Sequence, residues 1–200
     1  MRALAVVLAV LLAACAPAPE APRRSLTPEP APSSAASPDL LAQRRAAGLP
    51  DCPASSDLPA VTGGFPDVAL SCLGGGSTVR LAGLRGPMII NYWAQWCGPC
   101  RAEAPHLAEF SQMAGGKVTV LGIDAADPRP ELAIEFASMA GWRYVHLQDP
   151  ERRSMAPVGQ SLPVTVFVDA NGVIVYKNIG AFGSTQQIRD RVAQHLGVTV

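Results

Sequence analysis

The sequence predicts an α/β domain in which a central mixed β-sheet is flanked by helices and preceded by an N-terminal β-hairpin. Three observations support this prediction. Short apolar runs typical of buried strands alternate with segments whose apolar residues recur at helical spacing. The turn signal Asn171-Gly172 separates two such runs and indicates an antiparallel pair. About 150 residues, from Asp51 to Val200, have the usual size of one domain, and they contain no internal repeat.

The expected strands are short apolar runs bounded by turn signals. In chain order they are Val68–Cys72, Thr78–Leu81, Met88–Trp93, Lys117–Ile123, Tyr144–Leu147, Val164–Val168 and Val173–Tyr176. The first two are expected to form the hairpin, around the flexible Gly74-Gly75-Gly76. The alternation of strands and helices predicts that helices cover both faces of the sheet.

Three helices are expected among these strands. They run from about Cys97 to Met113, over Glu131–Ala140, and from Ser184 onwards. The first helix tolerates Pro99 in its first turn and should be kinked by Pro105. In the last helix, Ser184 stands three residues before Gln187, a spacing that suits a capping box.

The chain opens with the pattern of a secretory signal peptide. Met1-Arg2 supplies a positive start, and Ala3–Ala14 is apolar throughout. Twelve helical residues would cover only about 18 Å, against a hydrocarbon core of about 30 Å, so a transmembrane span is not expected. We expect residues 1–15 to be a signal peptide that directs export.

Residues 16–50 are expected to form a disordered tether. Pro, Ala, Ser and Arg dominate this stretch and large apolar residues are almost absent, so it cannot bury enough surface to offset its ordering entropy. A short helix from Leu40 to Arg45 is compatible with the pattern, which does not require it. Residues 51–200 are the expected folded domain.

Charge and cysteine content restrict the class of protein. The formal net charge is zero and charged residues make up 16% of the chain, so no basic surface indicates a nucleic-acid partner. Five cysteines are an awkward number outside the cytosol, because one thiol would be left exposed to oxidation.

The motif that carries chemistry is Cys97-Gly98-Pro99-Cys100. Two cysteines separated by two residues, straight after a buried strand and at the start of a helix, are a specific context for redox chemistry. A helix N-terminus offers unpaired N–H groups and a positive dipole potential that stabilise a thiolate. We therefore expect Cys97, with its sulfur facing solvent, to be the nucleophile, and Cys100 to resolve the mixed disulfide.

Different interpretations of this cysteine pair are weaker. A zinc site needs about four ligands, and the only thiols that could complete such a set are Cys52 and Cys72. A haem attachment site would have a histidine after Cys100, where Arg101 stands. A purely structural disulfide is also compatible with the spacing. No metal and no cofactor are therefore expected.

The block NYWAQWCGPC, from Asn91 to Cys100, contains the WCGPC motif of the thioredoxin superfamily. Over roughly residues 65–200 the chain resembles the membrane-anchored TlpA/ResA-like branch of thiol–disulfide oxidoreductases. The matching pieces are LAGLRG at 81–86, CRAEAP at 100–105 and LPVT at 162–165. The resemblance implies a thioredoxin-like fold and disulfide exchange with protein thiols.

Leu12-Ala13-Ala14-Cys15 resembles the cleavage box of bacterial lipoproteins, which implies that Cys15 is lipidated and becomes the new N-terminus. An ordinary signal peptide that happens to contain a cysteine is the alternative. Lipidation would leave four cysteines, which can form two pairs. The expected location is the outer face of the bacterial cytoplasmic membrane, where two or more acyl chains would hold the protein.

The resemblance also implies roles for residues around the cysteines. Pro163 matches a cis proline that faces the disulfide and leaves the Leu162 backbone free to pair with a substrate; a trans proline that starts a strand is the alternative. Glu103 matches an acid that exchanges protons with the buried thiol, or else it only complements the helix dipole. Asn91 replaces the buried acid of cytosolic thioredoxins and cannot titrate. Trp96 flanks the reactive sulfur or simply packs.

Cys52 and Cys72 are expected to pair in an oxidising compartment. A structural disulfide there would fasten the N-terminal edge of the domain and contribute roughly 3 kcal/mol through its loop. The alternative is a second redox couple that relays electrons to the Cys97–Cys100 pair. The histidines show no ligand spacing and are expected to be exposed or partly buried; they are His106, His146 and His195.

These observations predict an extracytoplasmic thiol–disulfide oxidoreductase that acts more as a reductant than as an oxidant. The Gly-Pro dipeptide is that of thioredoxin, and many members of the resembling branch keep exported cysteines reduced, for example on apocytochromes c during cytochrome c maturation. Such a protein needs a membrane electron donor, and an oxidant would need a membrane acceptor.

Two further functions fit the sequence less well. A thioredoxin-fold peroxidase usually has Thr or Ser three residues before the reactive cysteine, where Ala94 stands. A metal-delivery lipoprotein is the second, and the copper chaperones related to this fold use C-x-x-x-C, which is one residue longer than the spacing from Cys97 to Cys100.

Overall fold

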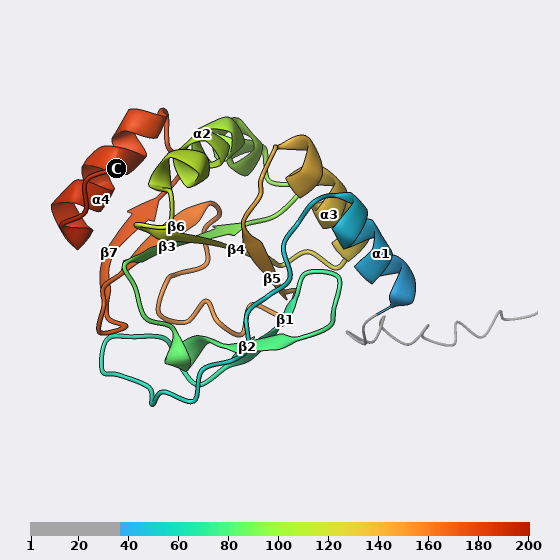
Figure 1. Cartoon of the computed structure of the whole chain (residues 1–200), viewed down its shortest axis with the longest axis horizontal. Helices are drawn as coiled ribbons and strands as arrows, with labels where there is room; N and C mark the ends of the chain where they lie inside the picture. Colours follow the sequence, from blue (N-terminus) through green and yellow to red (C-terminus); the bar gives the residue numbers. More distant parts are fainter. Residues whose placement is uncertain (1–36) are drawn as a thin grey trace, which may run out of the picture. The chain divides into compact units, whose positions relative to one another are not determined.

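The computed structural model describes residues 37–200 (Figure 1). The predicted signal peptide, the predicted lipidation site Cys15 and residues 16–36 of the predicted tether lie outside the described residues. No helix in the described part combines the length and the apolar character needed to cross a membrane.

The helices and strands follow the predicted order, with an additional helix at the N-terminal side. In chain order they are α1 (Pro38–Ala46), β1 (Ala69–Cys72), β2 (Thr78–Arg80), the 3₁₀ helix η1 (Leu81–Gly83), β3 (Met88–Trp93), α2 (Gly98–Ala114), β4 (Thr119–Ala125), α3 (Pro130–Met139), β5 (Val145–Asp149), β6 (Val164–Val168), β7 (Ile174–Ile179) and α4 (Thr185–Leu196). The largest shift of a boundary is at β7, which continues three residues beyond the predicted Tyr176.

Within residues 37–200, the strands form one seven-stranded sheet in the order β2-β1-β5-β4-β3-β6-β7. The pairs β3–β4 and β4–β5 are parallel, and the remaining pairs are antiparallel. The mixed α/β architecture is therefore confirmed. β3 lies between two neighbours and all six of its residues are buried, as its apolar run predicts.

The two faces of the sheet are covered differently, and the prediction that helices cover both faces is wrong. Buried residues of α2, α3 and α4 share one hydrophobic cluster with Ile89 and Trp93 of β3. The cluster on the other face contains Ile90 and Tyr92 but no residue of these helices. The reason is that the segment between β5 and β6 forms turns, and it closes this face with side chains such as Met155. All the labelled α-helices lie on the same side of the sheet in Figure 1.

α4 begins with the predicted cap, in a modified form. The Ser184 Oγ accepts a hydrogen bond from the Gln187 N–H at 3.2 Å. In a capping box the Gln187 side chain would accept from the N–H of Ser184 itself. Here its Oε1 accepts from the N–H of the preceding residue, Gly183, at 2.9 Å. The cap directs Ile188 and Val192 into the cluster that also contains α2.

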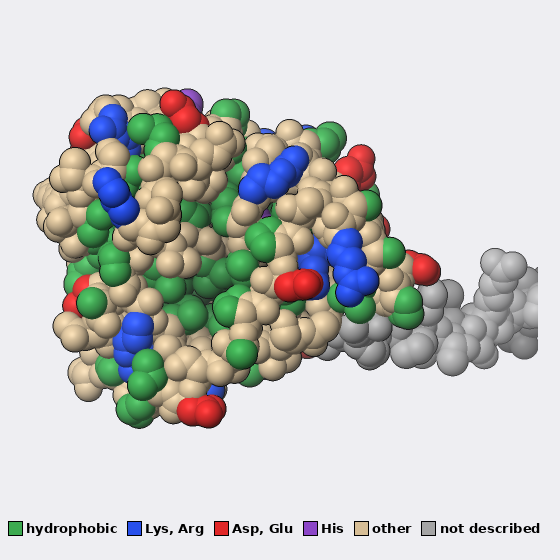
Figure 2. All heavy atoms as spheres, viewed as in Figure 1, with side chains coloured by type: hydrophobic (Ala, Val, Ile, Leu, Met, Phe, Trp, Pro, Cys, Tyr) green, Lys and Arg blue, Asp and Glu red, His purple; other side chains and the backbone are tan. Residues whose placement is uncertain are grey.

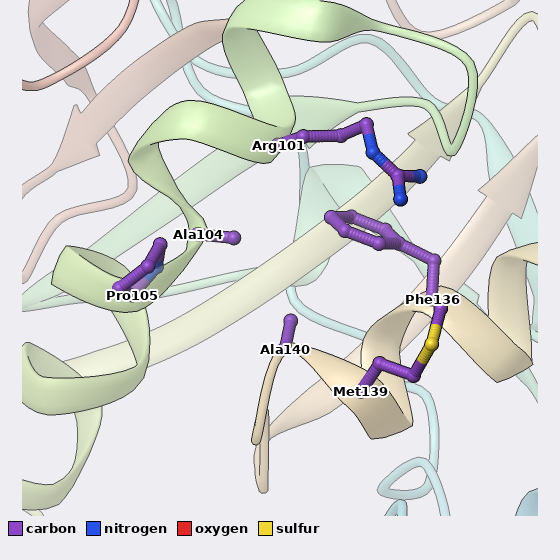
Figure 3. Close-up of a pocket in the computed structure, with 6 residues that line it drawn as sticks. All are labelled: Arg101, Ala104, Pro105, Phe136, Met139 and Ala140. Carbon is purple, nitrogen blue, oxygen red and sulfur yellow. The ribbon is translucent and has the colours of Figure 1, made fainter.

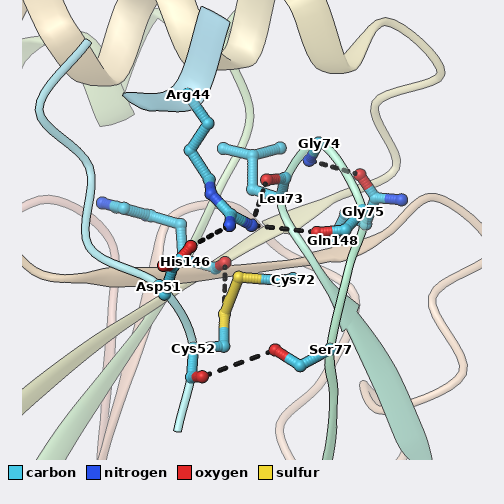
Figure 4. The surroundings of a disulfide bond; sticks show 10 residues. All are labelled: Arg44, Asp51, Cys52, Cys72, Leu73, Gly74, Gly75, Ser77, His146 and Gln148. Atoms are coloured by element: carbon cyan, nitrogen blue, oxygen red, sulfur yellow. Dashed lines mark hydrogen bonds and ion pairs between the residues drawn. A yellow bond between two sulfur atoms is a disulfide. The ribbon is translucent and has the colours of Figure 1, made fainter. Parts of the chain in front are cut away.

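The folded part of the chain begins earlier than predicted, so the expected tether boundary at residue 50 is wrong for residues 37–50. α1 is held by Arg44, which is buried and whose Nη1 donates to the carbonyl oxygens of Leu73 at 3.4 Å and Gly75 at 2.9 Å. Its Nη2 pairs with the Asp51 carboxylate (Figure 4). The Leu73 and Gly75 carbonyls are distant from Arg44 in sequence, so composition alone does not indicate these two hydrogen bonds.

The Cys52–Cys72 disulfide joins the segment after α1 to strand β1 (Figure 4). Cys72 is fully buried and Cys52 is nearly so. The Cys52 Sγ lies 3.5 Å from the His146 carbonyl oxygen, and the Ser77 Oγ donates to the Cys52 carbonyl at 3.4 Å. The predicted pairing is therefore present, and its sulfur atoms are enclosed by the N-terminal segment, the hairpin and β5.

Replacing both Cys52 and Cys72 with Ala should lower the free energy of unfolding by about 3 kcal/mol, because the closed loop spans 20 residues. Urea denaturation of the oxidised protein measures this loss. Disulfide exchange by the folded double variant should stay close to that of the wild-type protein. Exchange as low as that of a Cys97→Ala variant would instead mean that the second pair relays electrons.

Candidate active site

The Cys97–Cys100 disulfide stands where buried strand β3 meets helix α2. Cys97 is the N-cap of α2, and its Sγ accepts a hydrogen bond from the Cys100 N–H at 3.2 Å. The Cα atoms of the two cysteines are 5.3 Å apart. An N-cap acceptor satisfies one of the free N–H groups at the helix start, so the same groups are placed to stabilise a Cys97 thiolate.

Cys97 is less open than the sequence predicts. Only 3% of its surface is exposed, so the expectation that its sulfur faces solvent is wrong for the disulfide form, while Cys100 has no exposed surface. Its sequence neighbours Trp96, Gly98 and Pro99 are all exposed, and half of the Trp96 surface is open. The side chains and backbone of these neighbours therefore shield the sulfur, which a partner reaches only by docking closely.

Pro163 lies at the same edge of the sheet as the cysteines. Its bond to Leu162 is cis, as the resemblance implies. The pairing of Val164 with Tyr92 places Pro163 beside the end of β3, from which the chain continues to Cys97. Within the described residues, the Leu162 N–H and carbonyl make no backbone–backbone hydrogen bond. Neither group is therefore part of the β3–β6 ladder that begins with Val164.

Glu103 is a fully buried carboxylate on the same helix as the cysteines. It stands three positions after Cys100, so the two side chains are neighbours on one face of α2. Its Oε1 accepts from the Asn91 Nδ2 at 2.8 Å, and its Oε2 accepts from the Phe182 N–H at 3.0 Å. Burial raises the pKa of Glu103 from 4.5 to about 7, although both hydrogen bonds act in the opposite direction.

The buried network around Glu103 also includes Thr165, which was not among the predicted site residues. Asn91 Nδ2 donates to the Thr165 Oγ1 at 3.0 Å as well as to Glu103. Thr165 stands two residues after Pro163, in the LPVT segment. Its place in that motif is the sequence feature that could have identified it as a candidate site residue. Phe182 contributes only its backbone N–H, and no side-chain pattern reveals such a contact.

Aromatic side chains fill the space between α2, α3 and the sheet. Trp142 stacks on the imidazole of His146, with ring centres 5.1 Å apart, and its Nε1 donates to the Ala104 carbonyl at 3.0 Å. His146 is 2% exposed, so the expectation that it is at most partly buried is wrong. Burial lowers the pKa of His146 to about 3, which keeps the ring neutral at physiological pH.

A second buried acid, absent from the predicted site residues, lies at the end of β4. Asp124 has no exposed surface, and within residues 37–200 neither of its carboxylate oxygens has a hydrogen-bond partner. Burial and the nearby Asp127 raise the pKa of Asp124 well above its usual range. Asp124 is paired in register with Trp93, the last residue of β3. It lies in a run of apolar strand residues, and a charged residue in such a run is the sequence feature that could have marked it as a candidate site residue.

A pocket of about 460 Å³ lies between α2 and α3, one helical turn beyond the cysteines (Figure 3). Its lining is mostly apolar and consists of Arg101, Ala104, Pro105, Phe136, Met139 and Ala140. The Arg101 guanidinium lies 4.8 Å from the centre of the Phe136 ring, and its Nη1 donates to the Gln95 carbonyl at 2.9 Å. On the face drawn in Figure 2, acidic and basic side chains are scattered around a central apolar area.

The sequence matches the family model described as Redoxin over residues 55–194. It is 36% identical over 97 residues to the thiol:disulfide interchange protein DsbE homolog of Paracoccus denitrificans, covering 48% of this chain and 51% of that protein. It is 33% identical over 114 residues to the thiol:disulfide interchange protein DsbE of Allochromatium vinosum, covering 54% and 61%. The chain thus spans between half and two thirds of the length of these relatives.

The fold is also similar to that of a solved protein from Mycobacterium tuberculosis, a secreted disulfide oxidoreductase homologous to DsbE of Escherichia coli. The TM-score is 0.56 and the sequence identity 27%, and the match covers 64% of this chain and 96% of that protein. The thioredoxin-like fold implied by the sequence is therefore confirmed.

The raised pKa of Glu103 predicts a pH-dependent stability. The folded protein retains a proton that the unfolded chain loses at lower pH, so the free energy of unfolding should fall by about 3 kcal/mol as the pH rises from 4.5 to about 7. In the oxidised protein, Glu103→Gln should remove this part of the slope, as measured by urea denaturation at several pH values. The exposed-residue control Glu135→Gln should keep the slope. An unchanged slope in Glu103→Gln would contradict the assignment.

Proposed function

Because the chain belongs to the Redoxin family, we propose that it is a thiol–disulfide oxidoreductase that exchanges disulfides with protein substrates through Cys97 and Cys100. The observation that carries the proposal is the disulfide at the start of α2, of which only Cys97 has any exposed surface. The DsbE-like relatives are named for thiol:disulfide interchange, which supports the same chemistry.

In the proposed reductive direction, Cys97 is the nucleophile. Its thiolate attacks one sulfur of a partner disulfide, a Cys97–partner bond forms, and the other partner sulfur leaves as a thiolate that takes up a proton. Cys100 then attacks the Cys97 sulfur, which releases the second partner sulfur and forms the Cys97–Cys100 disulfide. The two cysteines lose two electrons and the partner disulfide gains them. The hydrogen bond from the Cys100 N–H to the Cys97 Sγ supports the first step, because the same donor can stabilise a thiolate.

Glu103 is proposed to accept the proton that Cys100 must lose before it attacks. Its carboxylate lies one helical turn from Cys100 and has no exposed surface, which a role limited to the helix dipole does not explain. A pKa of about 7 makes the carboxylate able to take and return protons near neutral pH. In the oxidative direction the same group returns the proton to Cys100.

The partner chain is proposed to dock along Trp96 and Leu162. Trp96 is half exposed beside Cys97, and its Nε1 donates to the Ala126 carbonyl at 3.3 Å, which holds the ring in place. The free backbone groups of Leu162, before cis Pro163, offer a hydrogen-bond donor and an acceptor to an extended segment. Backbone pairing of this kind suits many protein partners, because it does not depend on their side chains.

We propose that the exchange runs in the reducing direction outside the cytoplasm. The Gly98-Pro99 dipeptide is that of thioredoxin, and apocytochromes c with oxidised cysteines are a suitable substrate class. Electrons would come from a membrane donor. Lipidation of Cys15, after a signal peptide of residues 1–15, would keep the domain near that donor, and the following residues would serve as the tether. Introduction of disulfides into exported proteins is the alternative direction.

The second disulfide, Cys52–Cys72, is proposed to be structural. Cys52 lies in the segment after α1 and Cys72 ends strand β1, so neither sulfur stands at a helix start that would stabilise a thiolate, as Cys97 does. It closes the segment after α1 onto β1, at the far end of the sheet order from β3 and β6.

Cys97→Ala should abolish disulfide exchange, whereas Cys100→Ala should accumulate mixed disulfides that link partners to Cys97. Both effects follow from the proposed roles, in which Cys97 at the N-cap of α2 bonds to the partner and Cys100 breaks that bond. Non-reducing electrophoresis and mass spectrometry of the linked peptides measure the trapping. A Cys100→Ala variant that traps no partner and keeps full exchange activity would contradict these roles.

The reduction potential of the Cys97–Cys100 couple decides the direction of electron flow. We expect a value near about −250 mV or below, by equilibration with glutathione or dithiothreitol buffers. Such a value is near that of thioredoxin and suits a reductant supplied by a membrane donor. A value near about −120 mV would identify an oxidant and overturn the proposed direction.

A further inference from the structure

Asn91 occupies an unusual position between two hydrogen-bond acceptors. It has no exposed surface, and its Nδ2 donates to Glu103 Oε1 at 2.8 Å and to Thr165 Oγ1 at 3.0 Å. Its own Oδ1 is buried and has no hydrogen-bond partner in the described chain. An unsatisfied buried amide oxygen costs free energy, so its retention calls for an explanation.

The hydrogen bonds seen in the structure suit the ionised form of Glu103, which can only accept. Both of its oxygens accept from N–H donors, one from Asn91 and one from Phe182. The Phe182 N–H cannot become an acceptor, whereas the Asn91 side chain can present either a donor or an acceptor, so Oε1 is the oxygen at which a proton can gain a new acceptor. An O–H on Oε1 that pointed along the Asn91 contact would oppose the NH₂ group, because both groups are donors.

We propose that Asn91 is a positioning residue that turns its amide over when Glu103 takes up a proton. In the ionised state, Nδ2 donates to Oε1 as observed. In the protonated state, Oδ1 takes the place of Nδ2 and accepts from the Glu103 O–H. The two amide ends are nearly equal in size, so the turned group fits the same space, and its oxygen has two lone pairs. The Thr165 hydroxyl, which accepts in the first state, can donate to Oδ1 in the second.

This arrangement serves both protonation states of Glu103 at similar cost. In the ionised state Oδ1 is the end of the amide without a partner, as observed. In the protonated state the NH₂ group takes that place. Each state therefore carries the cost of one unpartnered end of the amide, and this cost favours neither state strongly. An ionised aspartate at this position could only accept, and beside Glu103 it would make a pair of carboxylates that retains a shared proton. The amide therefore explains how a carboxylate with two donors can still gain and lose a proton near neutral pH.

Several titratable groups besides Glu103 face this network. Their effects on the Glu103 titration must be distinguished from the effect of Asn91. Tyr144, just before β5, is buried, its hydroxyl has no partner within residues 37–200, and burial and the charge of Glu103 raise its pKa. Its hydroxyl is the competing acceptor for a Glu103 proton. His146 on β5 and Asp124 on β4 lie on the same face of the sheet, and the redox cysteines lie on α2. The oxidised protein removes the cysteines from the titration, because a disulfide does not bind protons.

The coupling of the amide turn to disulfide exchange rests on the proposed function. When Cys100 gives its proton to Oε1 and attacks the Cys97–partner bond, the amide turns, and it turns back when Glu103 releases the proton. Glu103 and Asn91 can be followed in the oxidised protein without any exchange reaction. Failure of the proposed function and failure of this inference are therefore distinguishable.

The experiment is a pH titration of the oxidised full-length protein by NMR. The Glu103 carboxyl carbon reports its protonation, and the nuclear Overhauser effect between the Asn91 NH₂ protons and the Thr165 methyl reports the amide orientation. We expect this effect to be strong above the Glu103 midpoint and to fall severalfold below it, with the same midpoint. An effect that stays constant through the midpoint would overturn the proposal.

Two variants separate a turning amide from a fixed donor. Asn91→Leu should move the Glu103 midpoint by less than about half a unit, because both states lose a partner. A fixed donor would stabilise only the ionised form, and its removal would raise the midpoint by about one unit or more. Tyr144→Phe should leave the midpoint within about half a unit. A lowered midpoint there would assign the proton to Tyr144 and overturn the role of Asn91.

Discussion

The positions of most elements in this fold follow from the burial of β3. All six of its residues are enclosed, with a parallel neighbour on one side and an antiparallel neighbour on the other. A strand in this position cannot shift without breaking two hydrogen-bonded ladders and exposing both hydrophobic clusters. Its end therefore delivers Cys97 to the start of α2 at a well-defined point. The same strand supplies Asn91 to one face, so the redox pair and the group that holds Glu103 are positioned by one element.

The Glu103 network connects α2 with two neighbouring strands and with the segment before α4. Asn91 comes from β3, Thr165 from β6, and the Phe182 N–H from the segment before α4. A buried carboxylate is costly unless hydrogen bonds compensate it, and here the compensation is only partial, since its pKa stays raised. This cost is the expected signature of a functional group, because a hydrophobic residue of similar size would stabilise the core more. The proposed proton chemistry and the packing of α2 therefore depend on the same contacts.

The N-terminal part of the fold is held by a different set of interactions. Arg44 binds backbone carbonyls of the β1–β2 turn, and the Cys52–Cys72 disulfide fastens the following segment to β1. These contacts lie at the opposite side of the sheet from β6 and β7.

Local sequence was sufficient to predict the strand and helix order, the redox motif, the cis bond before Pro163 through the family resemblance, and the cap at Ser184. Each of these depends on residues that are close together in the chain, where spacing and turn chemistry are decisive. Packing in three dimensions was needed to place all the helices on one face, to order α1, and to bury Cys97 and His146. It also selects the partners of Glu103, because Asn91, Thr165 and Phe182 are brought together by sheet register and helix packing. Contacts between residues so distant in sequence arise only when the core closes, and no local pattern encodes them.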